Sequence, residues 1–266
     1  MQTESTKPEV EATDNASHPA RLEWMRSYIA PGDRVLEIGC GTGWGVALPL
    51  RLSGIDIIGT DLDQESITRG REIFNRYGLD GDQILFDQDA ATVEGRFDAV
   101  IHNAGVYRAS AREVFIVNTV APYLLTCLMH RPDRLIYLSS DMHLQGRAHL
   151  EQLARDQSRV SYSDSKLYVT MLCMAVAHKW PDVYANAVDP GWVPTKMGGP
   201  GASDDLQQGY ETQVWLAVSE DRATQVSGQY FYHRTATPCN PQAGDIALQE
   251  RLLSICGELT GIAFPN

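Results

Sequence analysis

Short apolar runs alternate with longer helical patterns along most of this chain, and this alternation constrains the fold more than any other feature. Parallel strands need a crossover connection of roughly a dozen residues or more, which a helix supplies. Alternation of this kind therefore predicts a doubly wound α/β fold, in which helices cover both faces of a parallel sheet. At 266 residues, the chain suits a single domain better than two.

The expected elements follow from the period of the apolar residues. The predicted strands are short apolar runs, at 35–38, 56–59, 84–86, 99–102, 135–138, 184–188 and 229–232. The predicted helices have a longer apolar period, at 19–29, 42–52, 64–77, 111–130, 161–180, 204–219 and 243–259. Residues 1–17 are polar and lack apolar spacing, which predicts a disordered tail before a folded domain at 18–266.

Tyr162 and Lys166 are four residues apart, which places a phenol and an ammonium group on one face of the predicted helix 161–180. An ammonium beside a phenol favours the phenolate and lowers the pKa of the phenol from its usual value of about 10. Tyr162 would then be a general acid or base at a carbonyl oxygen. A half-buried tyrosine beside a solvated lysine has the same spacing, so the pair needs support from other residues.

That support comes from residues that follow predicted strands. The carboxyl ends of parallel strands meet at one edge of a sheet, where α/β proteins bind ligands. Residues placed just after such ends are Gly39, Asp61, Asn103, Ser140 and Pro190. We therefore expect them to share one crevice.

Several motifs occur in the chain order of the short-chain dehydrogenase/reductase family: His102-Asn103-Ala104-Gly105, Asn118, Ser139-Ser140, Tyr162, Lys166, Pro190-Gly191 and Thr195. From about residue 99 onward the chain resembles this family, in the branch with a long gap between serine and tyrosine. That branch has a histidine three residues after the serine, here His143. The resemblance implies a Rossmann-like fold that binds a nicotinamide cofactor.

The resemblance also implies roles for particular residues. Ser140 would polarise the substrate oxygen, and Tyr162 would exchange the proton. Lys166 would lower the pKa of Tyr162 and hold the nicotinamide ribose, and Asn118 would support a water that relays protons to Lys166. The cofactor-binding residues implied in this part of the chain are Asn103, Ala104, Gly105, Tyr162, Lys166, Pro190, Gly191 and Thr195.

The first third of the chain resembles a different family. Residues 35–43 fit a strand, a glycine turn and the start of a helix, and Asp61 ends a second predicted strand. With residues 87–90 and 97–100, they resemble the motifs of class I S-adenosylmethionine-dependent methyltransferases. The chain is therefore expected to be a hybrid, with its seam between Phe97 and Asn103.

Either adenosine cofactor would use the same groups in this third. A glycine turn lets the backbone approach the ligand, and a carboxylate after the second strand accepts both ribose hydroxyls. The expected binding residues are Gly39, Gly41, Gly43, Gly45, Asp61 and Asp89. Asp61 would repel a 2′-phosphate, so the preferred cofactor is NAD. Glu37, and Ile38 where the reductases have threonine, favour S-adenosylmethionine as the alternative.

The catalytic set has no use in methyl transfer, so the preferred interpretation is an enzyme, an oxidoreductase. It would transfer a hydride between NAD(H) and a carbonyl or alcohol group of a small, hydrophobic or cyclic substrate. The alternative is an S-adenosylmethionine-binding protein, either a methyltransferase or a reductase-derived scaffold with another activity. The second half shows no sign of the antiparallel hairpin that closes a methyltransferase sheet. A non-catalytic dinucleotide sensor would have lost Tyr162 or Lys166, and both are present.

Charge and composition restrict the partners. A net charge of −12 and a pI of about 5.0 argue against nonspecific binding to nucleic acid or to an anionic membrane, and they suit a neutral or cationic substrate. No apolar run approaches the roughly 20 residues of a membrane span. The cysteines and histidines show no metal-binding spacing, so no metal is expected.

We expect a cytoplasmic protein whose partner is a small-molecule substrate. By resemblance to the family, it would form a homodimer or homotetramer through the predicted helices 111–130 and 161–180. The residues expected to line the substrate pocket are Tyr107, Arg108, 142–147, Trp192 and 198–210.

Overall fold

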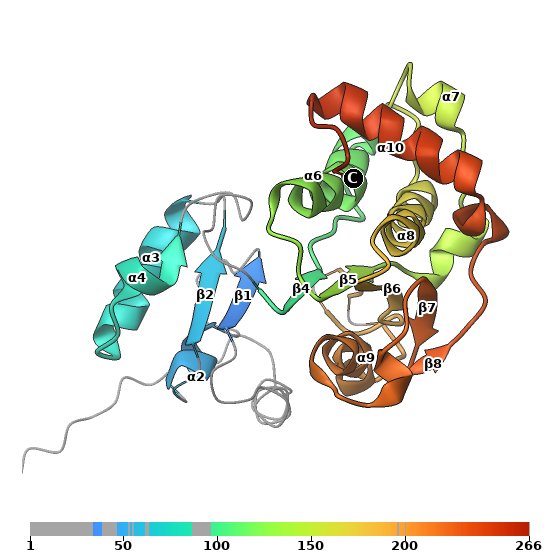
Figure 1. Ribbon diagram of the computed structural model, residues 1–266. Coiled ribbons are helices and arrows are strands. Elements are labelled where there is room, and N and C mark those ends of the chain that lie inside the picture. The colour runs from blue at the N-terminus through green and yellow to red at the C-terminus, as the bar shows by residue number, and fades with distance from the viewer. Residues whose placement is uncertain are drawn as a thin grey trace, which may run out of the picture.

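Strands and helices alternate through the described part of the chain, as the sequence predicts (Figure 1). The computed structural model describes residues 34–38, 47–52, 54, 56–61, 64–86, 97–195, 197–199 and 201–265. The expected tail 1–17, the expected helix 19–29 and the glycine turn at 39–45 lie outside these residues. Within them the protein has the predicted Rossmann-like α/β architecture.

Each predicted strand is present. The strands are β1 (Arg34–Ile38), β2 (Asp56–Thr60), β3 (Leu85–Phe86), β4 (Ala99–His102), β5 (Arg134–Leu138), β6 (Tyr184–Asp189), β7 (Gln229–Tyr232) and β8 (Thr235–Ala236). The α-helices are α2 (Ala47–Leu52), α3 (Gln64–Arg76), α4 (Gly81–Ile84), α5 (Ala111–Phe115), α6 (Ala121–Leu128), α7 (Leu150–Leu153), α8 (Tyr162–Lys179), α9 (Leu206–Val218) and α10 (Ile246–Thr260).

The strands form two ladders of backbone hydrogen bonds. β1, β2 and β3 pair in parallel, and β4, β5, β6 and β7 pair in parallel in that order. β1 lies beside β4, which gives the strand order of a doubly wound sheet. However, the described residues of β1 and β4 form no ladder with each other. The interruption coincides with the predicted seam between Phe97 and Asn103.

The end of the sheet carries a short antiparallel strand that the sequence analysis did not predict. β8 pairs antiparallel with β7, through Phe231 opposite Ala236 and Tyr232 opposite Thr235. The connecting residues His233 and Arg234 both have positive φ, 45° and 60°, as a tight hairpin turn requires. An antiparallel hairpin is therefore present in the second half of the chain, although its outer strand is only two residues long.

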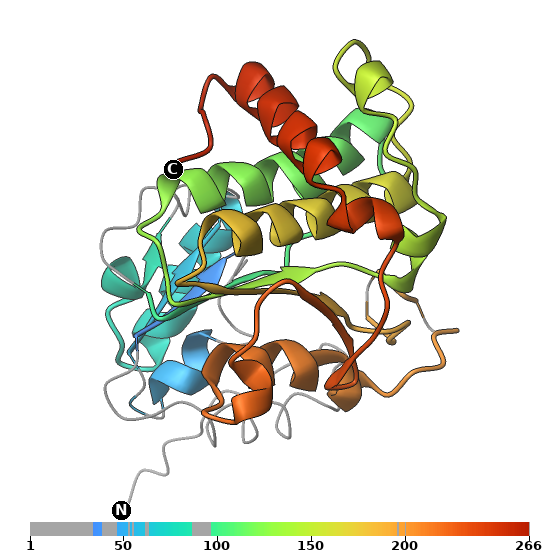
Figure 2. The same cartoon turned by 45° about the vertical axis from the view of Figure 1, so that its right-hand side comes forward.

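Alternate side chains of the central strands face two apolar cores. Leu135 and Tyr137 of β5 join the core between the sheet and α6, α8 and α10. Ile136 and Leu138 join the core between the sheet and α9. Figure 2 shows α6, α8 and α10 on one face of the sheet and α9 on the other. The helix α8 is buried around most of its circumference, as expected of a central core helix.

The predicted helix 111–130 is not regular. A π-helical turn, Ile116–Val120, separates α5 from α6. Ala111–Leu128 has the length and mean hydropathy, 1.2, of a membrane span, and 44% of it is buried in the protein. Phe115 and Tyr123 from this segment join the core around α8. Because π-helical turns in α-helices often mark functional sites, the residue at its centre, Asn118, is a candidate for function.

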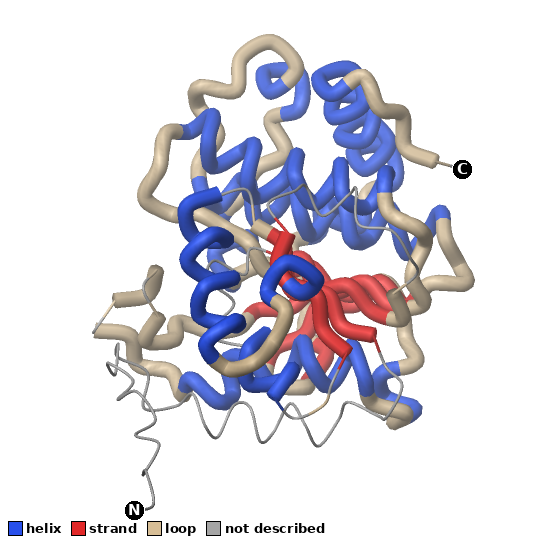
Figure 3. The backbone as a smooth tube through the Cα atoms, turned by 90° about the vertical axis from the view of Figure 1, so that its left-hand side faces the viewer, coloured by secondary structure: helices blue, strands red, loops and turns tan. Residues whose placement is uncertain are grey.

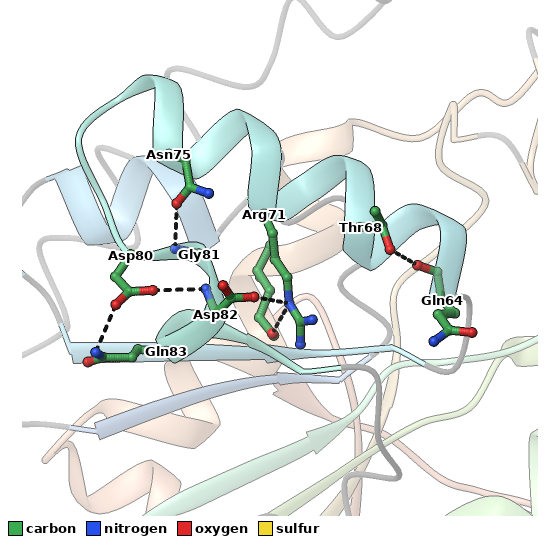
Figure 4. A network of polar contacts seen from close by, with 9 residues as sticks. Gln64, Thr68, Arg71, Asn75, Asp80, Gly81, Asp82 and Gln83 are labelled. Carbon is green, nitrogen blue, oxygen red and sulfur yellow. Dashed lines mark hydrogen bonds and ion pairs between the residues drawn. The ribbon is translucent and has the colours of Figure 1, made fainter.

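The first third of the chain has its own small core. Helices cover both faces of the strands, as the view from this side shows (Figure 3). The apolar residues that cluster here are Ala47, Leu48, Ile57, Ile67, Phe74, Ile84 and Leu85. Arg71 Nε donates to the Leu85 carbonyl at 2.9 Å and lies 3.3 Å from an Asp82 carboxylate oxygen, and the Gly81 amide donates to Asn75 Oδ1 at 3.1 Å (Figure 4). These contacts fasten α3 to α4 and β3.

We expect the amides of β1, β2 and α3 to exchange with solvent faster than those of β5, β6 and α8, on the order of tenfold or more. The reason is that the first third has a separate small core and an interrupted ladder to β4. Hydrogen–deuterium exchange read by mass spectrometry measures this difference. Equal protection on the two sides of the seam would contradict it.

Candidate active site

The first turn of α8 brings Tyr162 and Lys166 together. Ser161 caps this helix, and its hydroxyl and the Asp164 carboxylate form a reciprocal capping box, so the helix begins at Tyr162. Lys166 is only 4% exposed. Its Nζ donates to the Leu138 carbonyl at 2.8 Å, at the end of β5, and lies 5.5 Å from the centre of the Tyr162 ring. The predicted placement on one helix face is therefore confirmed.

Ser140 follows β5 and joins this pair. It caps a 3₁₀ turn, Asp141–Gln145, where its Oγ accepts from the Met142 amide at 3.3 Å. The same hydroxyl donates to Asp141 Oδ1 at 3.0 Å. Burial raises the pKa of Tyr162, and the nearby Ser140 side chain partly offsets this effect. The structure therefore places serine, tyrosine and lysine in one site.

Asn118 connects this site to the loop after β4. Its Oδ1 accepts from the Val106 amide at 2.8 Å, and its Nδ2 donates to the Val106 carbonyl at 2.9 Å and to Ser165 Oγ at 3.0 Å. Both amide protons of the side chain are thus used by protein partners. The side chain fixes the loop against α8, and the predicted water relay stays a prediction.

The loop after β4 lies over the lysine. A Cβ added to Gly105 would be 3.5 Å from Lys166 Nζ and 3.4 Å from Asn118 Oδ1. Glycine therefore leaves room beside the ammonium for a ligand to approach the backbone. Asn103 and Ala104 are exposed at the same strand end. Gly191, which follows β6, adopts φ +77°, a left-handed conformation that favours glycine.

The structure corrects the predicted effect of Lys166 on Tyr162. Burial raises the pKa of the phenol to about 12, and the carboxylates of Asp189 and Asp141 also raise it. Burial lowers the pKa of Lys166 from 10.5 to about 8, against the opposing effect of Asp189. The prediction of a lowered tyrosine pKa is wrong for this structure, because removal from water is the largest effect on this phenol.

Asp189 is a site residue that the sequence analysis missed. It ends β6 in a buried position, and its Oδ1 accepts from the Gly191 amide at 2.8 Å. Burial raises the pKa of this carboxyl. The sequence feature that could have identified Asp189 is its position, since it is an acidic residue directly after the apolar part of a predicted strand and directly before Pro190.

His143 is a positioning residue for Ser140. It is completely buried, so it does not line the substrate pocket. The Asn240 amide donates to Nε2 at 3.1 Å, so the ring proton is on Nδ1, which donates to the Ser140 carbonyl at 2.7 Å. Burial lowers the pKa of His143, which favours this neutral form. The imidazole therefore fixes the turn that carries Ser140.

The other expected cofactor residues are only partly described. Gly39, Gly41, Gly43, Gly45 and Asp89 lie outside the described residues. Asp61 directly follows β2, where its amide donates to the Phe86 carbonyl at 3.2 Å. Thr195 Oγ1 accepts from the Gly198 amide at 3.2 Å.

A cavity of about 500 Å³ is lined in part by Asp141, the residue that follows Ser140. Its lining residues are Asp141, Leu144, Asp189, Gly191, Trp192, Asp204, Tyr230, Tyr232, Thr237 and Pro238. Leu144, Trp192 and Asp204 fall within the predicted pocket segments. Tyr107 and Arg108 do not line this cavity, but the Tyr107 ring packs edge-on against Tyr162 at 4.9 Å between centroids. The residues from β7 and the segment after β8 were not predicted.

The Lys166 charge should make stability depend on pH. The folded pKa of about 8 lies below the reference value of 10.5, so the folded state loses the proton first. Below pH 8 the buried charge costs about 3 kcal/mol of unfolding free energy, and this penalty fades as the pH rises from 8 to above 10.

We therefore expect the wild-type protein to gain stability relative to Lys166→Met over this pH range. Urea unfolding of both proteins between pH 6.5 and 10 measures the gain, and Lys179→Met, which removes a partly exposed ammonium paired with Glu250 at the other end of α8, is the control. A constant difference between wild type and Lys166→Met at every pH would show that the lysine is not desolvated.

Sequence comparisons confirm the hybrid architecture. Residues 35–118 match a family model described as a methyltransferase domain, which extends past the expected seam. An uncharacterized oxidoreductase of Emericella nidulans is 40% identical over 185 residues, which are 64% of this chain and 71% of that protein. The short-chain dehydrogenase chyC of Penicillium rubens is 34% identical over 193 residues, 66% of this chain and 74% of that protein.

Solved structures share the fold. An uncharacterized protein from Mycobacterium paratuberculosis superposes with a TM-score of 0.65 at 19% identity, over 88% of this chain and 96% of that one. The NADPH-bound carbonyl reductase from chicken fatty liver has a TM-score of 0.52 at 20% identity, over 77% of this chain and 98% of that one. The oxidoreductase and dehydrogenase relatives show the family, and the solved structures agree with them in fold. The chain therefore belongs to the short-chain dehydrogenase family.

Proposed function

We propose that this protein is an NAD(H)-dependent reductase that converts a carbonyl group of a small organic substrate to an alcohol. The observation that carries the proposal is the convergence of Ser140, Tyr162 and Lys166 at the carboxyl end of β5. A methyl transfer has no step for a phenol placed between a serine hydroxyl and a buried lysine. Proton delivery to a carbonyl oxygen uses that arrangement directly.

The protonation state of Tyr162 supports reduction of a carbonyl group rather than oxidation of an alcohol. With a pKa raised to about 12 by burial, the phenol keeps its proton at neutral pH. It is therefore prepared to donate a proton to a developing alkoxide. Ser140 would orient that oxygen once its hydroxyl turns from Asp141 toward the substrate. His143 holds the serine turn in place meanwhile.

The residues present fit a nicotinamide cofactor. Gly105 leaves the backbone open beside Lys166 Nζ, and that ammonium uses one donor on Leu138 and keeps two for ribose hydroxyls. A bound nicotinamide would supply the hydride, while the proton comes from Tyr162. The chicken carbonyl reductase with the same fold binds NADPH. Here Asp61 at the end of β2 favours NAD(H), because a carboxylate repels a 2′-phosphate.

A second candidate is an S-adenosylmethionine-binding protein. The match of residues 35–118 to a methyltransferase domain favours it. Asp61 would serve the ribose of either cofactor. In that case the site at Ser140, Tyr162 and Lys166 would be a relic or would serve another reaction.

Tyr162→Phe should lower kcat by on the order of a hundredfold or more, because it removes the proton donor. The Kd for NADH should change little, since the hydroxyl acts on the substrate oxygen. Steady-state kinetics with a carbonyl substrate and fluorescence titration with NADH measure the two effects. Tyr168→Phe, on the same helix, is the matched control. If Tyr162→Phe retains most of the activity, the mechanism is incorrect.

A further inference from the structure

Three carboxylates line the cavity beside the candidate active site. Asp141 follows Ser140, Asp189 ends β6, and Asp204 lies in the segment before α9. Protein groups satisfy part of each: the Ser140 hydroxyl donates to Asp141, the Gly191 amide to Asp189, and the Trp192 amide to Asp204 Oδ2 at 2.7 Å. No lysine or arginine of the described residues forms an ion pair with any of the three.

Such a group of like charges is unfavourable without a counterion. Asp189 is buried, and its charge and that of Asp141 interact within the site. Lys166 is a nearby cation that offsets part of the charge of Asp189, but it forms no ion pair with Asp141 or Asp204. A cation inside the cavity would offset the mutual repulsion of the three carboxylates.

Tyr230 gives an independent indication of a ligand. This β7 side chain lines the cavity and is only 4% exposed, and its hydroxyl interacts with the Asp189 carboxylate without forming a well-aligned hydrogen bond to any described residue. A buried hydroxyl without a partner costs about 1 to 3 kcal/mol. After burial, the charges of Asp189 and Asp141 are the next causes that raise the pKa of Tyr230, so the phenol faces both carboxylates. Its oxygen is placed to accept a proton from a ligand bound between them.

Aromatic side chains complete the wall. Trp192 and Tyr232 line the cavity with Tyr230. Trp192 is 56% exposed, and its indole donates to the Gly198 carbonyl at 3.0 Å, which restrains the orientation of the ring. Aromatic faces favour an organic ammonium group over a metal ion, because they offer it both cation–π attraction and apolar contact.

We propose that this cavity binds a protonated amine of the substrate, so that the substrate is an amino ketone whose ammonium group sits between Asp141, Asp189 and Tyr230. The inference rests on the proposed reductase function for the position of the ketone. An ammonium bound to Asp141 competes with the Ser140 hydroxyl for that carboxylate. Binding thus releases Ser140 to donate to the carbonyl oxygen beside Tyr162, which couples amine recognition to catalysis.

Two ketones of nearly equal shape test the inference. 4-(Dimethylaminomethyl)acetophenone is cationic at pH 7, and 4-isobutylacetophenone replaces its ammonium nitrogen with carbon. Calorimetric titration of the full chain with each ketone gives a ratio of Kd values. We expect the cationic ketone to bind on the order of tenfold more tightly, as charge-assisted hydrogen bonds require.

Two variants identify the site. Asp189→Asn keeps the acceptor for the Gly191 amide and removes the charge. The preference for the cationic ketone over the neutral one should therefore fall from about tenfold to about threefold or less. Tyr230→Phe removes a hydroxyl that forms no well-aligned hydrogen bond to the described residues, so it should fold normally and weaken binding of the cationic ketone a few-fold. Asp182→Asn, before β6 at the opposite end of the same strand, is the control and should keep the wild-type ratio.

The outcomes separate the two proposals. Equal or tighter binding of the neutral ketone, absence of binding by the cationic ketone, or a ratio unchanged in both variants would overturn the amine site. If the expected ratio is found but neither ketone is reduced with NADH or NADPH, the amine site stands and the reductase proposal fails.

Discussion

The buried ammonium of Lys166 is the contact on which the rest of the site depends. It reaches from α8 to the carbonyl of Leu138 at the end of β5, beneath the loop that carries Gly105. Burying such a charge is costly, and Lys166→Met tests the size of that cost. A structural role alone does not explain why a lysine occupies this position, since an apolar side chain would pack there without the penalty. The cost is consistent with a position retained for binding and catalysis.

The sequence predicted the strands, the main helices and the convergence of Ser140, Tyr162 and Lys166, because these follow from local periodicity and from strand ends that meet at one sheet edge. It could not predict the direction of the Tyr162 pKa, which depends on burial. His143 and Asn240 were equally inaccessible as a pair, since their contact joins segments 97 residues apart. The acidic cavity was missed for the same reason, because β6, β7 and the turn after β5 meet only in the folded sheet.

The hybrid chain is physically reasonable. Both resembled families place an adenosine cofactor at the carboxyl ends of the first strands of a parallel sheet, so a junction in β4 keeps that edge continuous. Leu36 of β1 packs against the main core, which ties the first third to the catalytic part although their strands form no ladder. The junction therefore separates two apolar cores while the candidate ligand groups from both parts remain at one edge. Which cofactor spans this edge decides the function.

The central claim is that the dehydrogenase-like site, rather than the methyltransferase-like third, determines the cofactor. The most direct test is calorimetric titration of the purified protein with NADH, NADPH and S-adenosylmethionine in the same buffer. We expect NADH to bind most tightly, because Asp61 would disfavour a 2′-phosphate and Lys166 would hold a second ribose that S-adenosylmethionine lacks. Binding of S-adenosylmethionine alone would contradict the account.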